Sequence, residues 1–273
     1  MTQSNPNPNQ LARHLLDVAA SAARAVGPML VEGFTHGVTA SEKTAFYDLV
    51  TEYDRNAEKT ITQYIFEHHP DSAIVGEEGG AVGNGAVRWY VDPIDGTTNF
   101  ATGFPFFCVS IGAEFQGQLL AGVVFDPLRN ELFSAAAGGG ATLNGQPIRF
   151  EAIATEQAAV LLTDFPVPGL DADPAKYELF GQLSQRFQAV RRVGSTALQM
   201  AYVCCGRADA TLALHISPWD VAAGYLLIAE AGGVIQSLGR DQERPWLNRG
   251  FMAYPANFEL DRSVFKEFLR YNV

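Results

Sequence analysis

The segment that most constrains this 273-residue chain is residues 92–99, with the sequence Asp-Pro-Ile-Asp-Gly-Thr-Thr-Asn. It follows residues 87–91, whose β-branched and aromatic side chains predict a buried strand. Because proline cannot donate to a central ladder, Pro93 predicts that this strand ends at Asp92 and that the chain turns there. Gly96 and the polar residues after it predict a loop leading into a short helix, whose first amides can bind an anion.

Two carboxylates lie close together in this segment. Asp92 and Asp95 would repel each other, so without a cation at least one of them should have a raised pKa. A divalent ion would relieve the repulsion, and ligation by oxygen alone favours Mg²⁺ or Mn²⁺ over Zn²⁺. The alternative is a plain turn that ends a strand, since Asp and Gly are common turn residues.

Two other segments also place carboxylates at the ends of predicted elements. Residues 74–80 form a short apolar run that ends in Glu77 and Glu78, and residues 217–224 set Asp220 at the start of an apolar helix. An isolated aspartate at such a position is more often a helix cap, and paired glutamates are usually a solvated face. Three such ends in one chain nevertheless favour a shared metal site over three unrelated turns.

These segments make the chain resemble the inositol monophosphatases, within the lithium-inhibited, magnesium-dependent phosphatases. The resemblance runs from about Leu11 to the end, and three segments carry it in the family's order: residues 76–78 (Gly-Glu-Glu), 89–100 and 219–224. Shorter pieces agree, namely Lys43, residues 48–51, Asp54, residues 193–195 and residues 230–233. The fold implied is a layered αβαβα sandwich, of mixed α+β and α/β character, as in the fructose-1,6-bisphosphatases.

The resemblance also implies a role for each matching residue. The metal ligands would be the side chains of Glu77, Asp92, Asp95 and Asp220 and the carbonyl of Ile94, holding two or three Mg²⁺ ions, with Mn²⁺ as a possible substitute. The catalytic residues would be Asp54, Thr97 and Glu77. Asp54 and the Thr97 hydroxyl would orient a metal-bound water for in-line attack on phosphorus, with no covalent intermediate. Substrate would contact Lys43, Gly96, Thr97, Thr98, Gly194, Thr196 and Asp220.

Two positions, Lys43 and His215, leave alternatives open. Lys43 would reach the site from a loop, but an exposed surface lysine is an equally good interpretation of the sequence alone. His215 could contact substrate, although a lone histidine in an apolar run is more often structural.

The identity of the phosphorylated alcohol is the weakest part of the prediction. Family members that act on inositol phosphates commonly carry a glutamate six residues before the tryptophan of the Trp-Asp pair, and here that position is Ala213. We expect a phosphomonoesterase for inositol monophosphate, or the same chemistry on histidinol phosphate, fructose 1,6-bisphosphate or NADP. Residues 163–166 and Thr196 lie where the family contacts the leaving alcohol. A regulatory binding protein without catalysis is a third hypothesis, which the complete set of acidic residues disfavours.

The sequence lacks the motifs of other phosphatase and hydrolase chemistries. Enzymes that form an aspartyl phosphate need two aspartates with one residue between them, whereas two residues lie between Asp92 and Asp95. The chain has no Gly-x-x-x-x-Gly-Lys-Ser/Thr run, no Gly-x-Ser-x-Gly elbow and no His-Glu-x-x-His. Nucleotide-driven transfer, serine hydrolysis and zinc peptidase chemistry are therefore disfavoured.

The periodicity predicts a division of the chain into a tip and two halves. Residues 1–9 should be a disordered tip; residues 10–155 an α+β half with two helices, from Leu11 and from Asp48 to about His68, and an antiparallel meander over 106–150. Residues 156–273 should form an α/β half, with strands at 159–163, 189–193 and near Val234 and Phe251 and helices at 175–187, 197–204 and 218–231. The resemblance places the active site between the halves. The glycine-rich residues 135–140 fit a hairpin connection better than a phosphate loop.

Composition sets outer limits on partners and compartment. With 19 Lys and Arg against 30 Asp and Glu, the net charge of −11 argues against a broad nucleic-acid or anionic membrane surface, with Arg191 and Arg192 as local exceptions. Adjacent Cys204 and Cys205 cannot readily bridge each other, which suggests a reducing compartment. No segment has the pattern of a secretion signal or a membrane span, so we expect a cytoplasmic protein. The resemblance adds that a homodimer is common.

Overall fold

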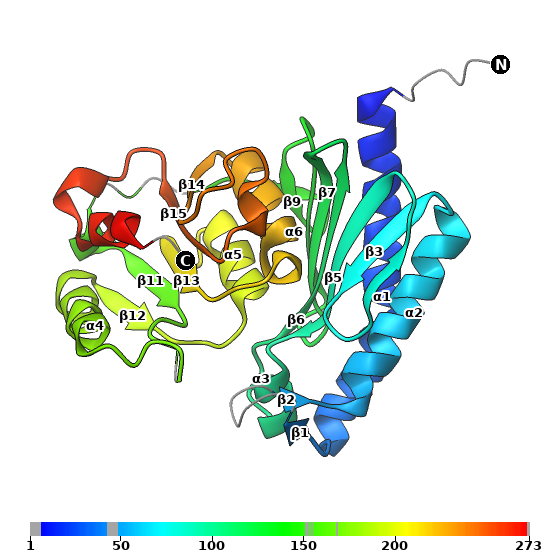
Figure 1. Ribbon diagram of the computed structural model, residues 1–273, viewed down its shortest axis with the longest axis horizontal. Coiled ribbons are helices and arrows are strands. Elements are labelled where there is room, and N and C mark those ends of the chain that lie inside the picture. The colour runs from blue at the N-terminus through cyan, green and yellow to red at the C-terminus, as the bar shows by residue number, and fades with distance from the viewer. Residues whose placement is uncertain (1–6, 43–48, 151–152, 154, 168, 272–273) are drawn as a thin grey trace.

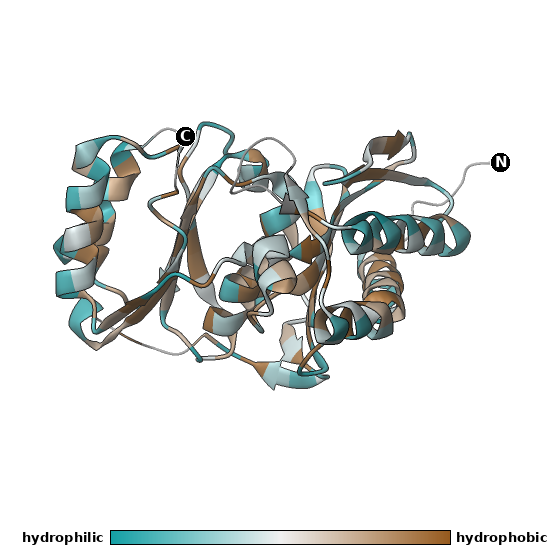
Figure 2. Ribbon diagram, turned by 90° about the horizontal axis from the view of Figure 1, so that it is seen from below, coloured by the Kyte–Doolittle hydropathy of each residue, from teal (hydrophilic) through white to brown (hydrophobic). Residues whose placement is uncertain are grey.

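Helices and sheets alternate in five layers along the long axis of the molecule (Figures 1 and 2). The computed structural model describes residues 7–42, 49–150, 153, 155–167 and 169–271. The layers are helices α1 (Pro8–His36) and α2 (Glu52–His68), an eight-stranded sheet, helices α5 (Thr196–Cys204) and α6 (Pro218–Glu230), a five-stranded sheet, and helix α4 (Pro174–Arg186) with the C-terminal 3₁₀ helices. The predicted αβαβα sandwich is therefore confirmed, while Lys43 and Asp48 lie outside the described residues.

Helices α1 (Pro8–His36) and α2 (Glu52–His68) form the first layer. The predicted start of α2 at Asp48 is wrong, because Leu49 lies in the short strand β2 (Leu49–Val50), paired with β1 (Ser41–Glu42). The helix begins later because Thr51 and Asp54 form a reciprocal capping box.

The eight-stranded sheet has the order β10-β9-β8-β7-β6-β5-β3-β4 and is antiparallel except between β3 and β5. Strands β6 to β10, the last five of this sheet in chain order, confirm the meander predicted over residues 106–150. The strands are β3 (Ser72–Gly76), β4 (Gly80–Gly83), β5 (Val87–Asp95), β6 (Cys108–Phe115), β7 (Gln118–Asp126), β8 (Glu131–Ala136), β9 (Ala141–Leu143) and β10 (Gln146–Ile148).

Strand β5 differs from the prediction, because it continues through Pro93 to Asp95. Its register with β6 pairs Asp92 with Ser110 and Asp95 with Cys108 and shifts between them. This irregularity accommodates the proline, since a bulge removes the need for a ladder hydrogen bond at that position.

The five-stranded sheet has the order β12-β11-β13-β15-β14, with β12, β11 and β13 parallel. Its strands are β11 (Val160–Thr163), β12 (Ala189–Arg191), β13 (Ala210–Leu214), β14 (Gly233–Ser237) and β15 (Gly250–Pro255). Strand β13, at the centre, is absent from the sequence prediction. The remaining helices are α3 (Thr97–Thr102), α4 (Pro174–Arg186), α5 (Thr196–Cys204), α6 (Pro218–Glu230), and the 3₁₀ helices η1 (Glu156–Ala158), η2 (Pro245–Leu247), η3 (Leu260–Arg262) and η4 (Val264–Arg270).

Three apolar clusters fill the spaces between the layers. The first joins α1 and α2 to the eight-stranded sheet, the second surrounds α5 and α6 between the two sheets, and the third lies between the five-stranded sheet and α4 with η4. Figure 2 shows the apolar sides of the helices turned toward the sheets. The cysteines are all unpaired, and no helix in the described residues has the length and apolar character of a membrane span.

The glycine-rich segment connects β8 to β9, as the hairpin interpretation predicts. The amides of Gly138 and Gly140 donate to the two carboxylate oxygens of Glu230 at 2.7 and 2.8 Å. Glu230 is the last residue of α6, so the loop already holds an anionic group that belongs to the chain itself.

Candidate active site

The irregular end of β5 presents both aspartates of residues 92–99 at the start of α3. Asp92 Oδ1 accepts the amide of Ile94 at 3.0 Å, which holds the carboxylate against the bulge. Gly96 adopts a left-handed conformation with φ of 100° and precedes the first residue of α3. A Cβ at this position would also lie 3.0 Å from the carbonyl oxygen of Gly194, so the turn requires glycine.

Asp54 and Thr97 meet beside this turn. The Thr97 hydroxyl lies 2.8 Å from Asp54 Oδ1 and 3.0 Å from the carbonyl oxygen of Ile94. The other oxygen of Asp54 accepts the amide and hydroxyl of Thr51 at 2.7 and 2.6 Å, as the N3 residue of the capping box. Burial raises the pKa of Asp54, and the charge of Glu77 adds to this shift, while the hydrogen bonds oppose it.

Burial and neighbouring acidic groups raise the pKa of both Asp92 and Asp95. The pKa of Asp92 lies well above its usual range because of burial and then because of the charges of Glu77, Asp95 and Asp220. Burial raises the pKa of Asp95 to about 7, although the Ser195 hydroxyl and the Ala197 amide donate to it. These carboxylates are costly to ionise together, and a bound cation would remove that cost.

The described side chains do not yet form a closed metal shell. Within the part of the chain that the structure describes, no three His, Cys, Asp or Glu side chains stand close enough together to hold an ion as they are. The chemistry of the donors nevertheless fits a hard divalent ion, because the neighbouring groups are carboxylates and a backbone carbonyl and because nearby acids disfavour the ionised forms of Asp92 and Asp95.

Asp95 also connects the eight-stranded sheet to the start of helix α5. Its Oδ2 accepts the Ser195 hydroxyl at 2.7 Å and the Ala197 amide at 2.6 Å, and its Oδ1 lies 3.3 Å from the Thr196 amide. The carboxylate therefore caps the N-terminus of α5 and interacts favourably with the positive end of that helix's dipole. Ser195 was not among the predicted site residues, although its place just before an apolar helix is a recognisable capping signal.

A second link fixes the loop before α5. Asn99 Nδ2 donates to the carbonyl oxygens of Val193 and Phe106 at 2.6 and 2.7 Å. Together with Asp95, it brings Gly194 and Thr196 beside the start of α3. The sequence prediction gave no role to Asn99, since nothing local identifies a contact between residues 94 positions apart.

Asp220 reaches the same region from α6. It is the N3 residue of a capping box with Ser217, whose amide lies 2.7 Å from Asp220 Oδ2. The Ser110 hydroxyl of β6 donates to the carbonyl oxygen of Trp219 at 2.9 Å, which ties the start of α6 to the eight-stranded sheet. The influence of Asp220 on the pKa of Asp92 places its charge near the end of β5.

The residues expected to contact the substrate differ in their exposure. Thr98 and Gly194 are exposed, and Thr196 is largely buried, beside Asp95. Asp164 accepts the Gly194 amide at 2.9 Å and the Gln199 side-chain amide at 2.6 Å, so both of its oxygens hold protein groups.

The surroundings of two other positions, His215 and Ala213, indicate a structural role. His215 Nε2 lies 2.8 Å from Asp171 Oδ1, which supports the structural interpretation of this histidine. Ala213 is 1% exposed in β13, so it has no polar group for a sugar hydroxyl.

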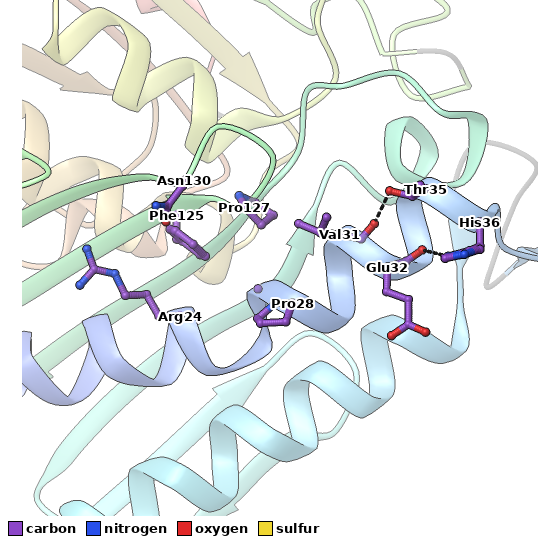
Figure 3. A pocket seen from close by; sticks show the side chains of 10 residues that line it. Arg24, Pro28, Val31, Glu32, Thr35, His36, Phe125, Pro127 and Asn130 are labelled. Atoms are coloured by element: carbon purple, nitrogen blue, oxygen red, sulfur yellow. Dashed lines mark hydrogen bonds between the residues drawn. The ribbon is translucent and has the colours of Figure 1, made fainter.

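A separate groove of about 590 Å³ lies along α1 near the β7–β8 turn (Figure 3). Pro28, Val31, Phe125 and Pro127 give it an apolar floor, with Glu32 and other polar residues around them. None of the predicted site residues lines this groove. Cavity size alone would therefore point away from the acidic cluster.

Comparisons with known proteins find relatives that match most of the chain. A model of the inositol monophosphatase family matches residues 11–268. The chain is 40% identical to the Nus factor SuhB of Xylella fastidiosa over 81% of this chain and 80% of that protein, and 40% identical to the inositol-1-monophosphatase of Synechocystis over 81% and 78%. The crystal structure of extragenic suppressor protein suhB from Bartonella henselae superposes with a TM-score of 0.84 at 32% identity, covering 95% of this chain and 99% of that one.

Proposed function

Because this chain belongs to the inositol monophosphatase family, we propose that it is a magnesium-dependent phosphomonoesterase that hydrolyses inositol monophosphate. The observation that carries the proposal is the acidic cluster of Asp92 and Asp95 beside the hydrogen-bonded pair of Asp54 and Thr97. Buried acids with raised pKa values beside a polar turn are typical of a functional site rather than of a stabilising ion pair.

Glu77, Asp92, Asp95, Asp220 and the carbonyl of Ile94 would hold two or three Mg²⁺ ions, or Mn²⁺ in their place. The bound ions would supply Lewis-acid chemistry, by neutralising the phosphate and the leaving oxygen.

Asp54 and Thr97 would orient the attacking water and accept its proton. When the Thr97 hydroxyl donates to Asp54, its lone pairs are free to accept a hydrogen bond from a water molecule. The raised pKa of Asp54 makes it a stronger base than an ordinary aspartate, because burial disfavours its charge. Glu77 would assist as the third catalytic residue, since its charge acts on both Asp54 and Asp92.

The phosphate and the alcohol would be held by different elements. The amides of Gly96, Thr97 and Thr98 at the start of α3 would bind phosphate oxygens, because the first amides of a helix lack partners within it. Gly194, Thr196 and Asp220 would border the alcohol, and Lys43 would add a positive charge. This division of labour suits phosphoryl transfer, which depends mainly on position and on charge neutralisation.

Because Ala213 stands where inositol-specific family members carry a glutamate, other phosphorylated alcohols remain candidate substrates. The methyl group of Ala213 offers no hydrogen bond, so histidinol phosphate, fructose 1,6-bisphosphate and NADP remain alternatives with the same chemistry. A regulatory binding protein is the alternative from another class, because relatives such as that of Xylella fastidiosa are named Nus factors. The presence of every acidic residue of the predicted site favours the enzyme. The cytoplasmic location and the homodimer remain predictions.

The test is phosphate release from inositol 1-phosphate, histidinol phosphate, fructose 1,6-bisphosphate and NADP, each with magnesium and with a chelator. Strong magnesium-dependent release from inositol 1-phosphate alone is expected, and strong release from another member would change the alcohol but not the chemistry. Equal rates on all four would contradict a dedicated alcohol site. No release from any, by folded protein with magnesium, would overturn the enzyme in favour of the binding protein.

A further inference from the structure

A buried glutamate of α2, Glu58, holds the turn that follows β3. Its side chain is 6% exposed, and its two oxygens accept two successive backbone amides. Oε2 lies 2.8 Å from the amide of Glu78, and Oε1 lies 2.6 Å from the amide of Gly79. A carboxylate is the side chain suited to this task, because both of its oxygens accept hydrogen bonds.

The local sequence leaves space for this carboxylate. A Cβ at Gly76 would lie 2.5 Å from Glu58 Oε2, and a Cβ at Gly79 would lie 2.7 Å from Glu58 Oε1. A side chain at either position would therefore displace the glutamate. Glycines on both sides of residues 77 and 78 explain how a side chain from α2 reaches the backbone of the turn.

As a result, backbone hydrogen bonds hold the chain at Glu77 and directly after it. Its own amide donates to the carbonyl oxygen of Val91 at 3.2 Å, one residue before Asp92 on β5. The next two amides are held by Glu58. The backbone of Glu77 is thus attached to the strand that carries Asp92 and to the helix that carries Asp54.

Helical spacing makes α2 the common support of both attachments. Asp54 and Glu58 are four residues apart and therefore lie on the same face of the helix. Asp54 contacts Thr97 at the start of α3, and Glu58 contacts the turn after Glu77. One face of one helix consequently sets the distance between two parts of the acidic site.

We propose that Glu58 is a positioning residue, which fixes Glu77 for divalent-ion binding without touching the ion or the substrate. The inference rests on the metal site of the proposed function and assigns to α2 a second role beside that of Asp54. Residues that orient metal ligands typically change metal affinity about 10- to 100-fold when they are substituted. Glu58 should affect affinity for the ion far more than the rate of the saturated enzyme.

The variant Glu58→Gln tests this directly, because it keeps the size of the side chain but replaces one acceptor by an amide that cannot accept. We expect its dissociation constant for Mg²⁺ and for Mn²⁺, measured by calorimetry without substrate, to rise about 10-fold or more. The magnesium concentration for half-maximal phosphate release should rise in parallel. The kcat at saturating magnesium should stay within about threefold of wild type, a split that general destabilisation would not produce.

Two matched variants separate positioning from stability. Glu67→Gln makes the same chemical change on the exposed part of α2, and Ile61→Val weakens the packing of the same helix at a side chain that cannot form a hydrogen bond to the turn. Both should bind Mg²⁺ as wild type does. If Glu58→Gln does not fold, Gly79→Ala perturbs the same contact from the other partner and should weaken Mg²⁺ binding in the same direction.

The outcomes are distinguishable. Wild-type affinity in folded Glu58→Gln or Gly79→Ala would overturn the inference and leave the proposed function intact. A loss of affinity in Ile61→Val equal to that in Glu58→Gln would also overturn it, because stability would then explain both. A wild-type protein that binds neither Mg²⁺ nor Mn²⁺ would overturn the metal site of the proposed function, and this inference with it.

Discussion

Two buried aspartates of this protein have opposite electrostatics. Burial raises the pKa of Asp95 to about 7, and the charges of Asp164 and Glu77 add to the shift. Burial acts on Asp171 in the same direction, but hydrogen bonds from Lys176, from the Val167 amide and from His215 outweigh it and lower its pKa. The protein therefore favours the charged form of Asp171 and disfavours the charged form of Asp95.

The difference lies in what surrounds each carboxylate. Asp171 is fully buried but has a lysine within the chain as its counter-charge. The charged groups that raise the pKa of Asp95 are themselves acids, and its hydrogen-bond donors are the neutral groups of Ser195 and Ala197. Asp171 therefore serves stability, whereas under the proposed function a cation from outside would complete the cluster of Asp92 and Asp95.

The largest effect should come from Asp92→Asn. The change keeps the shape of the side chain but removes a charge that would hold the ions, so we expect phosphate release to fall to background. Magnesium should stabilise the wild type against heat, by RT ln(1 + [L]/Kd), and should not stabilise this variant. Phosphate release and thermal melts with magnesium and with a chelator measure both effects. Near-normal turnover with unchanged magnesium dependence would contradict the assigned metal site.

Thr97→Ala should have the next largest effect, because it removes the hydroxyl between Asp54 and the water. We expect kcat to fall about 10²- to 10⁴-fold, the range for positioned acid–base groups, while Mg²⁺ affinity stays close to wild type. Thr102→Ala is the control, since its exposed hydroxyl at the end of α3 donates only within the helix. A Thr97→Ala enzyme that lost Mg²⁺ binding would place this hydroxyl among the supports of the metal site instead.

Asp171→Asn should act on stability and leave catalysis alone. Loss of hydrogen bonds to a charged group should lower the free energy of unfolding by about 1.5–3 kcal/mol at neutral pH. Urea unfolding measures the loss, and the exposed substitution Asp17→Asn should produce almost none. The comparison of the two aspartates fails if Asp171→Asn abolishes turnover in the folded protein.

Much of the fold follows from local chemistry. The run of β-branched residues before Asp92, the glycine at position 96, the apolar spacing of α2 and Asp220 at the start of α6 all predict elements that the structure contains. The turn residues between residues 106 and 150 likewise predict the meander. These signals are local, so they do not depend on which other element is near.

The failures have physical reasons. Strand β13 has a single β-branched residue, Thr211, among alanines and leucines, so its strand propensity is weak and its central place comes from pairing with β11 and β15. Pro93 ends a regular strand but not a bulged one, and the bulge depends on β6. The contact of Glu58 with residues 78 and 79 spans 20 and 21 positions, and no local pattern reveals it.

The smallest effect is a pH dependence, and it separates charge from packing at Asp171. The folded pKa of Asp171 is lowered from the usual value of 3.8, so the unfolded state binds a proton first as the pH falls. The stability that this group contributes is therefore fully present above about pH 4 and is lost as the pH falls through the folded pKa. The difference in unfolding free energy between wild type and Asp171→Asn should shrink between pH 5 and pH 2, as measured by urea unfolding at each pH. A difference that stayed constant down to pH 2 would mean that Asp171 stabilises the fold by its shape and its neutral hydrogen bonds, and the contrast with Asp95 would then not be one of charge.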